Sequence, residues 1–328
     1  MPLDHFVSQV HLRRFYSPVL GNRMYAIRKT DLKAFTPSAE VVCTIRDGST
    51  NAYLRQDRAV EEFLVTIEPN YNASLEKLVS GSIDHECIYT IAGFVAYVIT
   101  CSPAGMRIQS GPLRTAVEAG AALMDARGAL PRAPAALGGA SLTELLRDGT
   151  VKTKIDPKYP QAIGIDSIRR MTALFGNFKW EILRNNSDES PFFTSDFPVA
   201  IERTEDPRIL NRIVPLAPDL ALRIRPDPAI DGDGVDFSFA EFGYSSRRPS
   251  RDELVRLNRS IVRCAEDFVF YRDDHSWVRS FVSKNRWYRI DPRTDRLETP
   301  SGALLVSTQR IVARPSSSRS DDEKPVVG

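Results

Sequence analysis

The most constraining feature of this sequence is an uninterrupted apolar stretch, CIYTIAGFVAYVITC, over residues 87–101. A helix needs about 20 apolar residues to cross a bilayer, and this stretch is shorter. Because it has no polar face, it predicts a helix that is buried on nearly all sides. The rest of the chain must therefore supply enough structure to cover such a helix.

Composition and charge fit that requirement. The chain has 328 residues, of which 42% are hydrophobic and 26% charged, as in soluble globular proteins with a sizeable core. A net charge of +2 gives the whole chain no strong attraction to nucleic acid or membranes. The four cysteines lie far apart without a CxxC pair, and no secretory signal is visible. We therefore expect a cytoplasmic protein without disulfides and without a membrane anchor.

The order of the predicted elements indicates an α+β fold. A helical middle section is expected to pack on a largely antiparallel sheet whose strands differ in length, because helices and strands are segregated along the chain. Pro69 should kink or split the helix that contains it, and Ser141 with Glu144 predicts a capping box. Helices are expected at 57–80, 84–103, 112–127, 160–175 and 250–265, and strands at 23–29, 40–46, 179–185, 191–196, 198–202, 212–218, 220–226 and 267–273. The strands 179–185 and 191–196 are expected to form a hairpin.

Three parts follow from this pattern. Residues 1–274 are expected to form a single α+β domain with a loop at 126–140 that is rich in alanine, proline and glycine. Residues 275–314 are expected to form a small β appendage with basic and aromatic residues. The segment 315–328 is rich in serine, aspartate and proline and predicts a disordered tail.

The amino-terminal stretch HFVSQVHLRRF, residues 5–15, mixes two histidines, a glutamine and two arginines with apolar residues. Its His5, Gln9 and Leu12-Arg13-Arg14-Phe15 resemble the signature of the bacterial family called domain of unknown function 4238. The similarity continues through Glu68 in EEFLVTIE, then FGNFKWEIL, FFTSDFPV, IVPLAPDLAL and Asn258, and covers roughly residues 4 to 274. The resemblance implies a common fold and no established activity.

One segment departs from the family pattern. Members of that family often show Arg-Thr-Pro with another arginine beyond it after the long apolar helix, whereas this chain has Cys101-Ser102-Pro103 followed by Arg107 alone. The departure puts an anion-binding role at this helix end in doubt.

The signature residues suggest a catalytic hypothesis. If the amino terminus folds back onto the corner at Thr194–Pro198, then His5, Glu68 and Asp196 come from three segments and could form one catalytic centre. A divalent metal on Asp196 or Glu68 is compatible with this set, although no metal site is assigned and the cofactor stays open. The candidate substrate contacts are Gln9, Arg13, Arg14 and Ser195, with either arginine gripping a phosphate or carboxylate. The hypothesis predicts a hydrolase-like or nuclease-like enzyme acting on nucleic acid or a phosphorylated ligand.

The alternative hypothesis is a binding or interaction module without catalysis. Ser195 and Asp196 before Phe197-Pro198 are typical of a turn that ends a strand, with both side chains bonded to nearby backbone amides. His5 would then anchor the amino terminus to that turn as a buried, satisfied histidine. His11 is expected to face solvent or a strand neighbour.

Three further segments offer weaker candidates. DGDGVD at 231–236 resembles part of a calcium loop but lacks the glutamate at position 12, so a glycine-rich surface loop is expected. Asp273-Asp274-His275 is interpreted as a solvated turn. The segment 277–314 places many arginines among Trp277, Trp287 and other aromatic residues, a pattern compatible with nucleic-acid contact. Aromatic packing with arginines that extend to solvent is the favoured interpretation.

Overall fold

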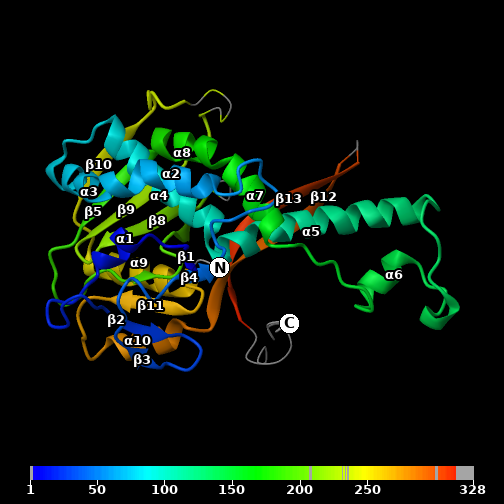
Figure 1. Ribbon diagram of the computed structural model, residues 1–328, viewed down its shortest axis with the longest axis horizontal. Helices are drawn as coiled ribbons and strands as arrows, with labels where there is room; N and C mark the ends of the chain where they lie inside the picture. Colours follow the sequence, from blue (N-terminus) through cyan, green and yellow to red (C-terminus); the bar gives the residue numbers. More distant parts are fainter. Residues whose placement is uncertain are drawn as a thin grey trace.

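The computed structural model describes residues 3–206, 209–230, 232, 234, 236–299 and 302–314. Figure 1 shows a layered body from which an arm projects to one side. The expected surface loop 231–236 is only partly within the described residues, and the expected disordered tail lies outside them. The architecture is α+β, as the sequence predicts.

The main sheet of the body has the order β10-β5-β9-β8-β7. Only the pair of β10 and β5 is parallel, and the other pairs are antiparallel. The strands are β5 (Lys179–Arg184), β7 (Ala200–Arg203), β8 (Leu210–Ala217), β9 (Leu220–Arg225) and β10 (Gly243–Arg247). Side chains of β5 alternate between two covered faces, since Trp180 contacts Phe242 on one side and Glu181 pairs with Arg223 on the other.

The expected hairpin of 179–185 and 191–196 is wrong. Strand β5 pairs with β9 and β10, whereas β6 (Thr194–Ser195) belongs to the second sheet. The physical reason is an Asx turn, in which the Asn185 side chain accepts from Ser187 N and redirects the chain. The backbone then follows the turn between β8 and β9, with Phe192 N bonded to Pro218 O.

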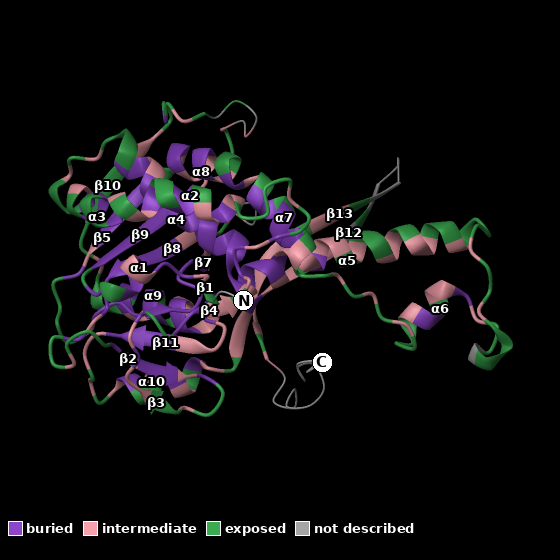
Figure 2. Ribbon diagram, viewed as in Figure 1, coloured by how far each residue is buried: buried purple, intermediate pink, exposed green. Residues whose placement is uncertain are grey.

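Helices cover one face of the main sheet (Figure 1). The predicted core helix is α4 (His85–Cys101), and almost all of its side chains are buried, as Figure 2 shows. It is capped by Asp84, whose carboxylate accepts from Cys87 N at 2.9 Å. Around it lie α2 (Ala59–Ile67), α3 (Tyr71–Ser80), α7 (Lys158–Asp166) and α8 (Ile168–Asn177). The break at Pro69 is confirmed, because a 3-10 turn (Glu68–Asn70) separates α2 from α3.

Two expected helix boundaries are wrong. Residues 160–175 are divided at Ser167 into α7 and α8. The helix expected to begin at Pro112 begins instead at Pro103, because Ser102 accepts from Gly105 N and caps α5 (Pro103–Ala126). Pro112 therefore lies inside α5.

A second layer lies on the opposite face of the main sheet. Helix α9 (Arg251–Cys264) packs there, and beyond it the second sheet has the order β3-β2-β11-β6. Its other strands are β2 (Tyr25–Arg28), β3 (Ala34–Phe35) and β11 (Phe268–Tyr271). A short antiparallel pair, β1 (Leu3–His5) and β4 (Thr44–Arg46), brings the amino terminus against this layer.

Between α9 and the main sheet lies a buried ion-pair network. Arg223 of β9 contacts carboxylates from β5, β7 and the helix, namely Glu181, Glu202 and Glu253. Arg247 of β10 adds two more bonds, to Glu181 at 2.8 Å and Glu253 at 2.7 Å. Because each charge has opposite partners, the network fixes how α9 sits on the sheet.

The arm consists of the outer part of α5, the short helix α6 (Leu142–Arg147) and the hairpin of β12 (Tyr288–Thr299) and β13 (Gly302–Ala313), which lies along α5 (Figure 1). The predicted capping box at Ser141 and Glu144 is confirmed. Gly111 lets the hairpin approach closely, since an added Cβ would lie 2.3 Å from Pro292 Cγ. The segment expected as a β appendage from residue 275 begins instead with a helix, α10 (Val278–Asn285), whose Val278 and Val282 pack in the body core.

No single helix of the described residues is long and apolar enough to cross a membrane, although α4 and α5 pass that test as a pair bent by 64°.

Candidate functional site

The amino-terminal signature forms a short helix, α1 (Gln9–Arg13), anchored by apolar side chains. Leu12 and Phe15 are fully buried in a small core cluster beneath it. The polar signature residues are joined in a ladder, because Arg13 donates to Gln9 Oε1 at 2.7 Å and Gln9 Nε2 donates to His5 Nδ1 at 3.3 Å. His5 Nε2 in turn donates to Ala39 O at 3.1 Å. Both nitrogens of His5 are therefore engaged in holding the segment.

His11 does not face solvent, and of the two expected alternatives the structure shows contact with a strand residue, Thr194 of β6. Its side chain is fully buried, with Nδ1 2.8 Å from the Tyr71 hydroxyl and Nε2 2.8 Å from Thr194 Oγ1. The ring stacks on Phe94 of α4 with centroids 4.8 Å apart. Burial lowers the pKa of His11 to about 3, so the ring is neutral at physiological pH. His11 is thus the residue by which the amino terminus reaches the Thr194–Pro198 corner.

A first cavity of about 380 Å³ lies beside the polar ladder. Glu68 faces it from the end of α2 and accepts a hydrogen bond from the buried hydroxyl of Ser8. The lining residues are Leu3, Asp4, His5, Gln9, Val10, Arg13, Glu61, Leu64 and Glu68. Arg14 is exposed and does not line it. This cavity therefore brings together His5, Gln9, Arg13 and Glu68 from the candidate set.

Asp196 lies at the corner between β6 and β7 and is almost completely buried. Its carboxylate accepts three backbone hydrogen bonds, from Glu266 N at 2.8 Å, Asp267 N at 2.7 Å and Phe268 N at 3.0 Å. Burial raises the pKa of Asp196 to about 7, against the stabilisation that the amide donors give to the charged form. The adjacent Ser195 hydroxyl is also buried and accepts from Phe197 N at 3.1 Å.

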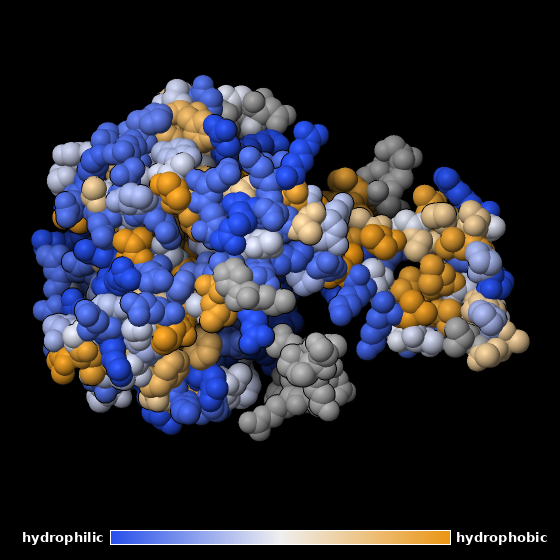
Figure 3. Space-filling model, in the orientation of Figure 1, coloured by the Kyte–Doolittle hydropathy of each residue, from blue (hydrophilic) through white to orange (hydrophobic). Residues whose placement is uncertain are grey.

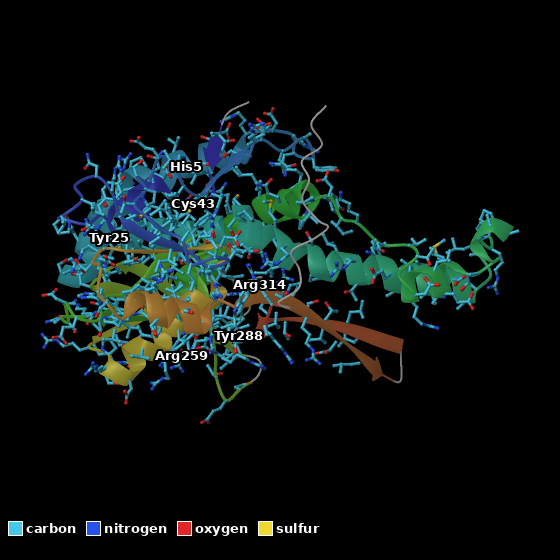
Figure 4. All side chains as sticks on the ribbon, turned by 90° about the horizontal axis from the view of Figure 1, so that it is seen from below. His5, Tyr25, Cys43, Arg259, Tyr288 and Arg314 are labelled. Carbon is cyan, nitrogen blue, oxygen red and sulfur yellow. The ribbon has the colours of Figure 1, made fainter. Side chains whose placement is uncertain are left out.

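A buried lysine stands near this corner. Lys29 donates through Nζ to Ala265 O at 2.6 Å and Tyr288 O at 2.9 Å, and burial lowers its pKa to about 8. Figure 4 shows Tyr288 and Arg314 near each other where the hairpin joins the body. Lys29 therefore connects β2, the end of α9 and the start of the hairpin.

Arg107 is the arginine that follows Cys101-Ser102-Pro103, the segment at which this chain departs from the family pattern. The guanidinium of Arg107 contacts Glu266 at 2.7 Å and Asp291 at 2.9 Å and donates to Ile290 O. Arg314 pairs with the same Glu266 at 3.4 Å. Basic groups are thus present at this helix end, but acidic side chains of the chain itself already neutralise them.

A second cavity, of about 570 Å³, opens on the other side of the amino-terminal strand. Its walls are mainly apolar, and Asp196 lies at its polar end. The lining residues are Phe6, Arg28, Lys33, Phe35, Val41, Val42, Cys43, Thr44, Pro103, Asp196, Glu266, Asp267 and Phe268. Cys43 is buried, and burial raises the pKa of its thiol well above the usual value, so it is protonated.

The structure therefore separates the predicted catalytic set. His5 and Glu68 line the first cavity, Asp196 lines the second, and Ser195 and Arg14 line neither. Among the residues that the structure describes, no three His, Cys, Asp or Glu side chains gather in a way that could hold a metal ion. Sequence reasoning missed the burial of His11 and Lys29. The apolar neighbours Val10 and Leu12 were a signal for His11, whereas Lys29 lies between Arg28 and Thr30 and offered none.

Some of the basic side chains of the carboxyl-terminal segment are paired. Arg289 contacts Asp291 at 2.7 Å, Arg293 contacts Asp295 at 2.8 Å, and Arg310 contacts the same Asp295 at 3.7 Å. Basic residues outnumber acidic ones in this segment, so it keeps a net positive charge, and nucleic-acid contact stays a prediction.

Comparison with known proteins gives one result. The model of the family described as protein of unknown function (DUF4238) matches residues 4–275. The chain belongs to this family. No significant match was found among curated proteins or among solved structures. Two parts of the resemblance to this family can be located in the structure. His5, Gln9 and Arg13 form the polar ladder beside α1. Ser195 and Asp196 form the corner at which the Asp196 carboxylate accepts hydrogen bonds from backbone amides.

Proposed function

We propose that the chain is a ligand-binding protein whose site is the 570 Å³ cavity beside the amino-terminal strand. Its ligand is an apolar molecule with one anionic group, about the size of a medium-chain fatty acid. The observation that carries the proposal is the composition of the cavity, which combines apolar walls with a single unpaired cation at its edge.

The apolar walls support the first half of this proposal. Three aromatic rings, Phe6, Phe35 and Phe268, line the cavity together with Val41 and Val42. Phe35 and Phe268 are in edge-to-face contact with centroids 5.7 Å apart, which fixes that wall. The volume lies within the range of about 300–1,000 Å³ that is usual for small-molecule sites.

The charges that line the cavity support the second half. Asp196 accepts from backbone amides, and Arg28 pairs with Asp31 at 2.5 Å. Glu266 pairs through Oε1 with Arg107 and Arg314, while its buried Oε2 has no hydrogen-bond partner among the described residues. Asp267 pairs with Arg314 at 3.4 Å. Lys33 is exposed and has no ion-pair partner among the described residues. Among the described lining residues, Lys33 is therefore the unpaired cation with which an anionic group on the ligand would pair.

The polar groups near the site favour binding over hydrolysis. A general base needs an acceptor atom within reach of the substrate, and a nucleophile needs activation by such a base. Here His5 and Asp196 are committed to the protein's own backbone, and the Cys43 thiol is protonated. The hydrolase-like hypothesis has no comparable support.

Titration calorimetry with decanoate and with decanol tests the proposal. Decanoate should bind saturably, with a negative heat-capacity change from apolar burial, and Val41→Trp should weaken it at least tenfold by filling the cavity. Val65→Trp is the matched control, since Val65 is equally exposed and lies on α2 away from the cavity.

A charge variant tests the anionic group. Lys33→Ala should weaken decanoate roughly two- to fivefold and leave decanol unchanged, as expected for an exposed ion pair. Lys152→Ala, an exposed lysine outside this cavity, should change neither. No saturable binding of decanoate, or equal binding by the Val41→Trp protein, would overturn the proposal.

A further inference from the structure

A third cavity, of about 450 Å³, lies in the body beside α9 and shares no lining residue with the proposed ligand site. It is formed where α9, the turn before α10 and the chain between β5 and β6 meet. The lining residues are Glu189, Ser190, Arg251, Val255, Asn258, His275, Ser276, Trp277 and Phe281.

The wall of this cavity is aromatic and held in place. Trp277 and Phe281 meet edge to face with centroids 5.8 Å apart, and Phe193 packs against both. Trp277 Nε1 donates to Glu189 O at 3.1 Å, which ties the turn to the β5–β6 segment. Asn258 of α9 accepts from Phe193 N and donates to Pro191 O. These bonds give the cavity a fixed shape.

Three polar groups of the cavity have no partner among the described residues, namely the Nε2 atom of His275, the guanidinium of Arg251 and the carboxylate of the exposed Glu189. The ring of His275 stacks nearly parallel to Trp277, and its buried Nε2 atom has no hydrogen-bond partner among the described residues. Buried polar atoms are almost always bonded, so this nitrogen is an exception among the described residues. The exposed Arg251 likewise has no ion-pair partner in the described part of the chain.

The position of Arg251 does not serve the stability of α9. It is the first residue of the helix, where a positive charge is repelled by the positive end of the helix dipole. The next two residues, Asp252 and Glu253, carry the negative charge that this end of a helix favours. A ligand carboxylate beside Arg251 would compensate this charge through a two-pronged hydrogen bond.

We propose that this cavity is a second binding site, for an aromatic molecule that carries one anionic group. The rings of Trp277 and Phe281 contact its aromatic part, and Arg251 pairs with its anionic group. The site would thus recognise a different ligand shape from the cavity beside the amino-terminal strand, and it does not depend on the function proposed for that cavity.

Three probes with the same ring and different charge test the proposal by titration calorimetry on the full chain: indole-3-acetate, indole-3-acetamide and tryptamine. Indole-3-acetate should bind tightest and tryptamine weakest. Arg251→Ala should weaken indole-3-acetate about fivefold and leave indole-3-acetamide unchanged. The control Arg256→Ala removes another exposed arginine of α9 that does not line the cavity, and it should change nothing.

Two further variants separate binding from folding. Ser276→Trp replaces an exposed cavity residue and should reduce binding of all three probes at least tenfold, whereas Ser280→Trp, exposed on α10 outside the cavity, should not. The proposal is overturned if no probe binds saturably, if tryptamine binds tightest, or if the Ser276→Trp protein binds indole-3-acetate as well as the original chain does.

Discussion

The corner around Asp196 and the arm around α5 differ in which side chains are buried and in what those side chains contact. At the corner, the polar side chains of His11, Asp196 and Lys29 are buried and each is bonded to the protein itself. On the arm, Val117, Leu123 and Met124 leave about half of their surface exposed, and Figure 3 shows apolar side chains gathered over its far end. The body therefore depends on specific polar bonds, whereas the arm depends on helix formation and a few contacts with the hairpin.

The largest expected effect is the loss of the Asp196 carboxylate. Asp196→Ala should lower the free energy of unfolding by about 3–5 kcal/mol, because three buried backbone amides lose their acceptor. Urea denaturation followed by circular dichroism measures it.

The arm offers a matched control for that carboxylate. Asp125 also accepts a backbone hydrogen bond, from Thr143 N at 3.1 Å, but it lies in the arm, where water can replace it. Asp125→Ala should leave the urea midpoint of the body unchanged. Equal losses in the two variants would contradict the contrast between corner and arm.

The next largest effect is the decrease in the free energy of unfolding at low pH that the buried His11 causes. The folded protein holds this ring neutral with a pKa of about 3, whereas the unfolded chain protonates it near pH 6.5. The contribution of His11 to the free energy of unfolding is therefore fully present above the pKa of the unfolded chain. It is lost as the pH decreases toward the pKa of the folded protein. Between pH 7.5 and 5.0 the loss from this residue should be about 2 kcal/mol.

Comparison with His11→Gln isolates that contribution. Asp196, with its pKa raised to about 7, acts in the opposite direction over part of the same range, because its neutral form is favoured by burial. The difference in urea stability between the original chain and His11→Gln should therefore shrink by about 2 kcal/mol from pH 7.5 to pH 5.0. A constant difference would show that His11 takes up a proton without loss of the fold.

The same contrast explains what the sequence could predict. The apolar run 87–101, the split at Pro69 and the capping box at Ser141 depend on residues within about one or two helical turns, and all three are present. The acceptor role of Asp196 depends on amides at 266–268, some 70 positions away, and no local pattern encodes that meeting. The neighbours of β5 also come from later parts of the chain, β9 and β10, which is why a hairpin with the next segment was the wrong expectation.

The contacts of the candidate site were likewise predictable only between residues that lie near one another in the sequence. His5, Gln9 and Arg13 lie close together in the sequence, and the polar ladder joins them across the end of β1 and the helix α1. Whether Asp196 reaches that face depends on the order of strands in the second sheet. The structure places β1 and α1 between the two cavities, and the sequence contains no signal for that separation.

Within the arm, the contact between α5 and the hairpin should be its most sensitive point. Gly111→Ala would bring Cβ to 2.3 Å from Pro292 Cγ, so the hairpin must move away from the helix. Hydrogen exchange of hairpin amides should become at least threefold faster, while the urea midpoint of the body changes little. Unchanged exchange would mean that the hairpin is held chiefly by its junction, where Lys29 and Arg107 bond to it.

The smallest effect is expected further along the same helix, at Gly120. An added Cβ there meets nothing within 4 Å, so Gly120→Ala changes only the helix propensity and should stabilise α5 by up to about 1 kcal/mol. Hydrogen exchange in residues 113–126 should slow, with no change at the body amides. Hydrogen exchange is expected to become faster with Gly111→Ala and slower with Gly120→Ala. This difference distinguishes the part of α5 that packs against the hairpin from the part that is surrounded by water. Slower exchange in both variants would indicate that the hairpin does not press on α5, and the arm would then resemble a free helix along its whole length.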